Sequence, residues 1–169
     1  MTHAAIFSSG YRDARGKFIE AAQRCRASLT EHVLPGILGP EGESLITDVA
    51  TLGPHDAESA LLILSGTHGL EGPAGSAIQT ALLDRLDATD LPDGVRLVLV
   101  HAVNPWGFAW QSRTTEDNVD LNRNFLDFAA PLPANPGYRE LHEIICRSDM
   151  SEGTQAEILS ALDEYQSRH

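Results

Sequence analysis

ALLILSGTHGLEG, residues 60–72, joins an uninterrupted apolar run to a glycine-rich polar segment. An apolar run of this length predicts a strand buried on both faces, and a helix is expected over residues 73–86. A second apolar run, VRLVLVHAV at residues 95–103, predicts another buried strand. The order strand, loop, helix, strand indicates an α/β fold with a mainly parallel or mixed sheet flanked by helices.

Weaker patterns extend this assignment toward both ends of the chain. Apolar residues at helical spacing predict a helix from Tyr11 to Leu34, and Leu45 to Leu52 is predicted to form an exposed or edge strand. Beyond Phe128 the sequence is rich in proline and then predicts two amphipathic helices, over residues 138–146 and 154–165.

The composition excludes several classes of partner. The chain has 169 residues, 42% of them hydrophobic, and a formal net charge of −12. This acidity argues against binding to nucleic acid or to an anionic membrane, because both require a basic surface. The N-terminal segment has no apolar core of the kind found in signal peptides, and Cys25 and Cys146 form no disulfide or zinc motif. We therefore expect a cytoplasmic location.

His68 and Glu71 form an H-x-x-E pair directly after the first apolar run. On a turn entering a helix, this spacing places both side chains on one side. A neutral imidazole and a carboxylate are suitable ligands for Zn²⁺. The same spacing also occurs between unrelated surface residues, so the pair alone is a weak indication of a metal site.

Three polar residues after the second apolar run are candidates for binding a substrate. Arg113, Asn122 and Arg123 offer planar donors that suit a carboxylate or a polarised carbonyl. The alternative is that the arginines pair with nearby acidic residues on the surface, namely Glu116, Asp117, Asp120 and Asp127. His101, at the end of the second run, could support a ligand or be a core residue.

Three ordered segments resemble the zinc carboxypeptidases of the carboxypeptidase A type, especially a little-characterised bacterial branch. They are SGTHGLEG (residues 65–72), NPWGFAWQSR (residues 104–113) and NVDLNRNF (residues 118–125). The chain resembles more distantly the aspartoacylase and succinylglutamate desuccinylase deacylases. The resemblance implies the N-terminal part of a zinc-carboxypeptidase-like (phosphorylase/hydrolase-like) fold.

The resemblance also implies roles for individual residues. His68 and Glu71 would be two of three protein ligands of a single zinc ion. Arg113 would polarise the scissile carbonyl and is thus the expected catalytic residue. Asn122 and Arg123 would bind the substrate carboxylate, and the loop at Asn104 and Pro105 would position these elements.

The resemblance further requires a third zinc ligand and a glutamate that serves as general base, and the sequence offers neither. His142 and His169 are the remaining histidines after Arg123, and neither follows a predicted strand. We therefore expect residues 1–169 to form one domain that is the incomplete N-terminal portion of a longer catalytic domain. Uncovered apolar strands then predict a homo-oligomer, or pairing with the missing C-terminal portion.

The sequence thus predicts a hydrolase, namely a metallopeptidase (protease) of carboxypeptidase type that cleaves an amide bond next to a free carboxylate. One alternative is a zinc-dependent deacylase of small N-acyl amino acids. Another is a non-catalytic protein that only binds carboxylates. The expected ligands are accordingly zinc and a peptide or N-acyl amino acid with a free carboxylate.

Overall fold

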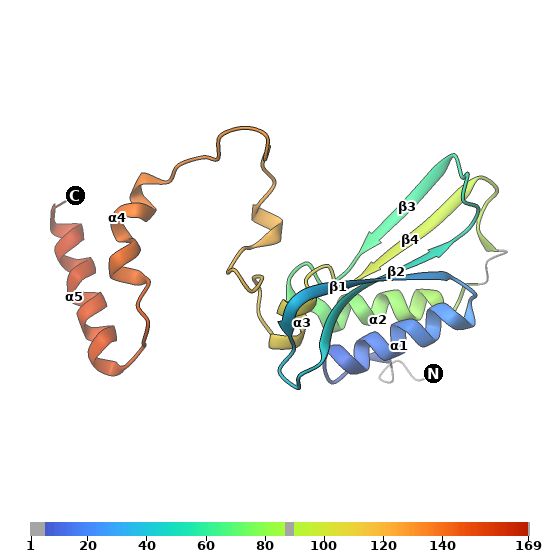
Figure 1. Ribbon diagram of the computed structural model, residues 1–169, viewed down its shortest axis with the longest axis horizontal. Helices are drawn as coiled ribbons and strands as arrows, with labels where there is room; N and C mark the ends of the chain where they lie inside the picture. The colour runs from blue at the N-terminus through green and yellow to red at the C-terminus, as the bar shows by residue number, and fades with distance from the viewer. Residues whose placement is uncertain (1–5, 87–89, 169) are drawn as a thin grey trace. The chain divides into compact units, whose positions relative to one another are not determined.

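The computed structural model describes residues 6–86 and 90–168, and the chain divides into two compact units, residues 1–125 and 126–169. Each unit is described by itself (Figure 1). Unit 1 contains, in chain order, α1 (Tyr11–Arg24), β1 (Ser28–Leu38), β2 (Ser44–Leu52), β3 (Ser59–Leu64), the 3-10 turn η2 (Gly69–Glu71), α2 (Gly72–Leu83), β4 (Val95–His101), α3 (Pro105–Trp110) and the 3-10 turn η4 (Leu121–Arg123). Unit 2 contains α4 (Pro136–Ile145) and α5 (Glu152–Arg168).

Unit 1 is built on a four-stranded mixed sheet with the strand order β1-β2-β4-β3. β2 pairs antiparallel with both β1 and β4, whereas β3 pairs parallel with β4. The parallel pair needs a crossover, and α2 provides it. The predicted α/β class with a mixed sheet flanked by helices is confirmed.

The two long helices of unit 1, α1 and α2, lie side by side on one face of the sheet (Figure 1). The core between them and the sheet combines small and large apolar side chains from four elements. Its fully buried members are Phe18, Ala21, Ala22, Cys25, Ala50, Leu52, Leu83, Leu97 and Leu99. The alternation of β4, with Leu97 and Leu99 on this face, therefore fixes which side of the sheet faces the helices.

The predicted helix over residues 11–34 is wrong in its second half. α1 ends at Arg24, Arg26 adopts a left-handed conformation (φ 61°), and the chain continues as β1. The helical spacing of the apolar residues was misleading here, because hydrogen-bonded pairing of β1 with β2 outweighs local periodicity.

Two predictions about strand position are also wrong. β2 is a central strand with alternating buried residues, not an exposed or edge strand. β3 is an edge strand, and Leu61, Leu62 and Leu64 are each more than half exposed, although burial on both faces was predicted. No further strand pairs with its free edge in the described part of the chain.

A buried ion pair fixes α1 to the sheet. The guanidinium of Arg15 donates Nε–H to Oδ2 of Asp48 at 2.8 Å and an Nη2 hydrogen to Oδ1 at 2.9 Å. The Asp48 side chain on β2 is 1% exposed. Burial raises the pKa of Asp48, and the hydrogen bonds from Arg15 oppose that rise. Removal of the cation would therefore leave a carboxylate stranded in the core.

His101 at the end of β4 is a core residue. Its ring stacks on Phe18 with the ring centroids 4.5 Å apart, and its Nε2 lies 2.9 Å from Ser76 Oγ. Its Nδ1 is buried and has no hydrogen-bond partner among the described residues. Burial, reinforced by the charge of Arg15, lowers the pKa of His101 from 6.5 to about 4.

The free energy of unfolding should fall as the pH is lowered from 7 to 5. Between pH 6.5 and about 4, the unfolded chain binds a proton that the folded chain does not, so stability decreases with falling pH. The expected loss from this group is about 2 kcal/mol between pH 7 and pH 5. Urea unfolding at both pH values tests it. His101→Gln keeps a donor for Ser76 and should remove the contribution of His101 to the change in unfolding free energy with pH. An unchanged pH dependence in this variant would contradict the assignment to His101.

Unit 2 pairs two helices. Tyr165 Oη on α5 donates to Glu140 on α4 at 2.8 Å, and His142 Nδ1 lies 3.1 Å from Tyr138 Oη within α4. Both helices predicted in this region are confirmed; α4 begins two residues earlier and ends one residue earlier than predicted, and α5 extends beyond the predicted range at both ends. Neither these helices nor the others in the described residues are long and apolar enough to span a membrane.

Candidate metal and carboxylate site

His68 is placed by the turn between β3 and α2. It stands immediately before η2, and its side chain is only 8% exposed. The turn is tight, because a Cβ on Gly69 would overlap the backbone of Gly107 in α3. Gly69 therefore allows η2 to approach α3 closely, and this approach fixes the backbone that carries His68.

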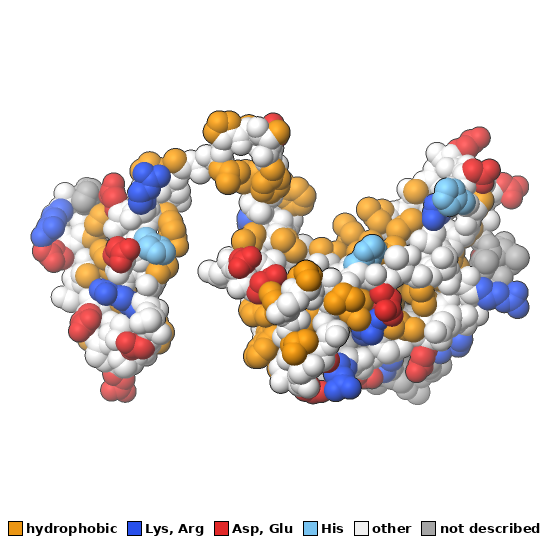
Figure 2. Space-filling model, in the orientation of Figure 1, with side chains coloured by type: hydrophobic (Ala, Val, Ile, Leu, Met, Phe, Trp, Pro, Cys, Tyr) orange, Lys and Arg blue, Asp and Glu red, His pale blue; other side chains and the backbone are white. Residues whose placement is uncertain are grey.

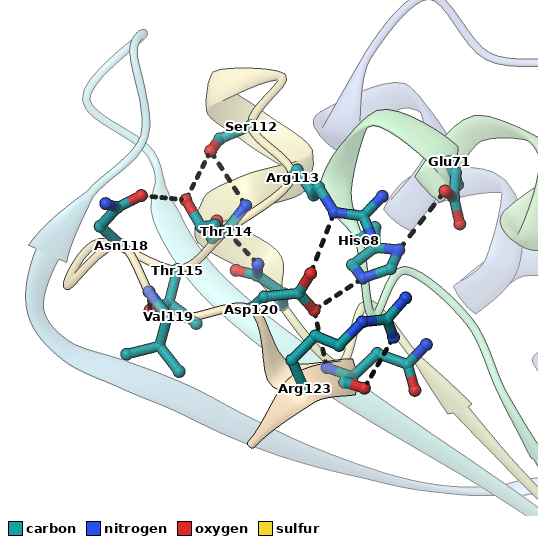
Figure 3. Close-up of polar contacts among 12 residues, drawn as sticks. His68, Glu71, Ser112, Arg113, Thr114, Thr115, Asn118, Val119, Asp120 and Arg123 are labelled. Atoms are coloured by element: carbon teal, nitrogen blue, oxygen red, sulfur yellow. Dashed lines mark hydrogen bonds and ion pairs between the residues drawn. The ribbon is translucent and has the colours of Figure 1, made fainter. Parts of the chain in front are cut away.

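The imidazole of His68 lies between two carboxylates (Figure 3). Nε2 lies 2.9 Å from Oδ1 of Asp120, and Nδ1 lies 3.4 Å from Oε1 of Glu71. Asp120 is an ionised acceptor, so we assign the ring hydrogen to Nε2 and the lone pair to Nδ1. The Nδ1 lone pair then faces a second acceptor, Glu71. A positive charge between these two atoms, either a proton or a metal ion, would relieve their repulsion.

Asp120 joins three parts of the site. Besides contacting His68, it accepts a hydrogen bond at Oδ2 from Arg113 Nε at 3.0 Å and one at Oδ1 from the backbone N–H of Asn122 at 2.9 Å. The hydrogen bond with His68, followed by those from Arg113 and Asn122, lowers the pKa of Asp120 to about 2. Asp120 therefore remains a carboxylate at neutral pH, which fixes both the tautomer of His68 and the plane of Arg113.

The loop that carries Arg113 and Asp120 is held by a buried amide. Asn104 caps α3, where its Oδ1 accepts from Gly107 N at 2.8 Å, and its Nδ2 donates to Thr114 O at 3.0 Å. Asn118 turns the same loop in a left-handed conformation (φ 59°) and accepts from Thr114 Oγ1. The end of β4 is thus tied directly to the segment that reaches His68.

The structure joins four of the five residues predicted for the site: Glu71 contacts His68, and Asp120 links His68 to Arg113 and to the backbone N–H of Asn122. Arg123 follows Asn122 in η4. Arg123 is exposed and donates to Asn122 O at 2.9 Å (Figure 3). Arg113 also pairs with a nearby acidic residue, as the alternative expected. That residue is Asp120, which itself contacts His68.

From the sequence, Asp120 is a possible surface partner for the arginines and a member of the segment NVDLNRNF that carries the resemblance, but no role in the site was expected for it. The available signal was its place two residues before Asn122 in NVDLNRNF. Its contact with His68, 52 positions earlier in the sequence, becomes visible only when the loops after β3 and β4 meet. Carboxylate support of a histidine ligand is common at zinc sites, so Asp120 is a candidate for this role.

The spacing of His68 Nδ1 and Glu71 Oε1 fits two of the four coordination positions of a tetrahedral zinc ion. In a tetrahedral site with metal–ligand bonds of about 2.1 Å, neighbouring ligand atoms lie about 3.4 Å apart. The observed separation of Nδ1 and Oε1 is 3.4 Å, which is longer than an ordinary hydrogen bond. Within residues 6–86 and 90–168, however, no group of three or more His, Cys, Asp or Glu side chains is arranged to hold a metal ion.

Replacing Asp120 with Asn should lower zinc affinity by about 10- to 100-fold, because loss of a carboxylate that supports a histidine ligand has an effect of this size. Titration of the chain against a zinc-competing dye measures the change. Asp117→Asn is the matched control, since Asp117 is exposed in the same loop. Equal affinity in the two variants would contradict the assigned role of Asp120.

Comparison with known proteins gives one family and several partial structural similarities. The family described as "Protein of unknown function (DUF2817)" matches residues 7–169. No curated protein matches the chain in sequence.

Three solved structures with partial similarity are glutaminyl cyclases. That of Fimbriiglobus ruber is 12% identical with a TM-score of 0.41 and covers 59% of this chain and 41% of its own. That of Porphyromonas gingivalis is 15% identical with a TM-score of 0.35 and covers 57% and 45%. That of Macrostomum lignano is 18% identical with a TM-score of 0.38 and covers 56% and 31%. The chain thus spans less than half the length of each.

Proposed function

The chain belongs to the DUF2817 family of proteins of unknown function, and we propose that it supplies half of the active site of a zinc-dependent amide hydrolase of carboxypeptidase type. The observation that carries the proposal is the placement of His68. Its Nε2 is engaged by Asp120, and its Nδ1 lies at ligand spacing from Glu71. His68 and Glu71 would hold the metal.

The roles of the polar residues follow from their positions. Asp120 keeps His68 in the tautomer whose Nδ1 can donate its lone pair, and it holds the guanidinium of Arg113 beside the imidazole. Arg113 would then be placed to stabilise negative charge that develops on a substrate carbonyl oxygen. Asn122 and Arg123 would bind a free carboxylate. A bound zinc ion would supply Lewis acidity and an activated water.

The proposed reaction is hydrolysis of an amide bond next to a free carboxylate. The zinc-carboxypeptidase-like fold, the peptidase activity and the single zinc ion all belong to this proposal. So does the prediction that residues 1–169 are part of a longer catalytic domain. The third ligand and the general base would come from outside the site described here.

One observation favours a second candidate, a non-catalytic protein that binds carboxylates. Only two ligand positions are provided by the described residues, and Arg123 on η4 is exposed and available to an anion. Such a protein would bind the C-termini of peptides without turnover. The deacylase alternative shares the same half-site and differs in its substrate.

A substrate panel distinguishes these functions. The zinc-loaded longer protein that contains this chain, and with it the third ligand and the general base, should cleave peptides with a free C-terminal carboxylate and leave their C-terminal amides intact. Arg123→Ala should lower kcat/KM by about 10- to 100-fold, since a charged hydrogen bond contributes about 1.5–3 kcal/mol. Arg139→Ala on α4 is a control for general charge effects. Release of acyl groups from N-acyl amino acids alone would favour the deacylase, and binding without turnover would favour the non-catalytic protein.

A further inference from the structure

Gln79 on α2 is a buried amide whose polar atoms all contact the two parallel strands. Figure 2 shows charged side chains on the surface of unit 1, where water satisfies them, whereas Gln79 is 1% exposed and needs partners inside the protein. Its Nε2 donates to the backbone carbonyls of Ile63 on β3 at 3.0 Å and of Val100 on β4 at 3.1 Å. Its Oε1 accepts from Ser65 Oγ at 2.8 Å. One side chain thus joins α2 to the ends of both strands.

The partners of Gln79 allow only one orientation of its amide. Backbone carbonyls are acceptors, so the NH2 group must face them and the amide oxygen must face the hydroxyl of Ser65. The helix also lies directly against this serine, because a Cβ on Gly75 would come within 2.9 Å of Ser65 Cβ. The contact between α2 and the end of β3 is therefore fixed by packing as well as by hydrogen bonds.

The contacts of Gln79 lie where β3 and β4 end and their loops begin. Gly66 (φ 68°) and Ala102 (φ 58°) adopt left-handed conformations just beyond the strands. The backbone N–H of Asn104 still donates to Gly66 O at 3.0 Å. The first loop leads to His68, and Asn104 ties the second to the segment that contacts His68 from the other side. Both segments of the candidate site therefore start from the strand ends that Gln79 joins.

We propose that Gln79 is a positioning residue of the candidate site: it fixes the two strand ends relative to each other, and thereby the contact between His68 and Asp120. This contact joins residues 52 positions apart in the sequence, so its length of 2.9 Å depends on where the two loops begin. The contact selects the tautomer of His68 with hydrogen on Nε2. The role of His68 as a metal ligand rests on the proposed function, whereas the effect of Gln79 on the tautomer does not.

A purely structural role for Gln79 leads to a different outcome. Loss of a buried amide with three partners lowers stability in either case. Leu83 provides the comparison, because it lies one turn further along α2, is 1% exposed and packs in the apolar core. Its truncation to alanine leaves a cavity but keeps every hydrogen bond of Gln79. Loss of stability and loss of site geometry are therefore separable.

Nitrogen-15 NMR of the histidine rings in the metal-free full chain tests the proposal, at about pH 8, where histidine is ordinarily neutral. The wild type should show the Nε2–H tautomer of His68, identified by the signals that disappear in His68→Ala. Gln79→Met should show a mixture of both tautomers and a lower midpoint of urea unfolding. Leu83→Ala should also lower the midpoint but keep the single tautomer. A single tautomer in Gln79→Met, or an equal mixture in both variants, would overturn the proposal.

Ser65→Ala is the milder variant, which keeps the proposal testable if Gln79→Met does not fold. It removes only the hydroxyl that orients the amide. The second tautomer of His68 should therefore appear in Ser65→Ala, in a smaller fraction than in Gln79→Met. A single tautomer in Ser65→Ala would count against the proposal.

Zinc affinity gives a separate readout. Gln79→Met should lower it by about 10-fold, at the low end of the effect of residues that orient a metal ligand, and Leu83→Ala should leave it unchanged. Equal zinc affinities in Gln79→Met and the wild type would contradict the positioning role. Absence of zinc binding in the wild type would instead contradict the proposed function, and the tautomer of His68 would still decide the role of Gln79.

Discussion

His68→Ala should lower the affinity of the chain for zinc by roughly 100- to 1,000-fold. Structural zinc sites gain about 10–16 kcal/mol from four ligands, so one ligand contributes about 3–4 kcal/mol. Two protein ligands then give a dissociation constant in the micromolar range. Isothermal titration with zinc measures the dissociation constants of the wild type and of His68→Ala.

The control for this variant is another histidine of unit 1. His32 is exposed on β1, away from the turn that carries His68, and His32→Ala should leave the affinity unchanged. Glu71→Gln should lower the zinc affinity by less than His68→Ala but by more than His32→Ala, because an amide oxygen is a weaker zinc ligand than a carboxylate. Equal losses in the His68 and His32 variants would mean that zinc binds nonspecifically to the surface.

Arg15→Ala should destabilise unit 1 by about 3–5 kcal/mol, because it leaves the buried carboxylate of Asp48 without its cation. The two hydrogen bonds between these side chains are 2.8 and 2.9 Å long, and Arg15 also contacts Glu31 at 2.6 Å. The loss is read from urea unfolding followed by circular dichroism at pH 7.

Two further variants show that the loss comes from the stranded charge. Arg15→Met combined with Asp48→Leu should recover most of the stability, since replacing both members of a buried pair with apolar residues is often neutral. Arg12→Ala removes an ion pair to Glu41 in which both side chains are about two-thirds exposed. It should cost less than about 1 kcal/mol. A similar cost for Arg12→Ala and Arg15→Ala would contradict the explanation.

The class of the fold could be predicted because its strongest elements have strong local patterns. The apolar runs at residues 60–65 and 95–103 lie at β3 and β4, and the helix between them was placed to within a few residues. β1 could not be predicted, since Leu29 and Val33 are spaced as on a helix and only pairing with β2 makes them a strand. The exposure of the β3 side chains could not be predicted either, because an apolar run does not show which strand lies at the edge of a sheet.

The candidate site was predictable where residues are close in sequence. His68 and Glu71 are three positions apart, and their spacing anticipated their contact. The links from Asp120 to His68 and from Asn104 to Thr114 depend on loops that meet only in the folded chain. Its charge made Asp120 look like a surface residue in the sequence, whereas in the structure Asp120 connects His68 to Arg113.

We propose that His68 and Glu71 are the protein ligands of a zinc ion in this chain, and X-ray absorption spectroscopy of the chain loaded with one equivalent of zinc can identify these ligands. We expect a coordination shell of nitrogen and oxygen atoms with the scattering of a single imidazole, and loss of that imidazole scattering in His68→Ala. A sulfur ligand, scattering from two or more imidazoles, or an unchanged spectrum in His68→Ala would contradict it.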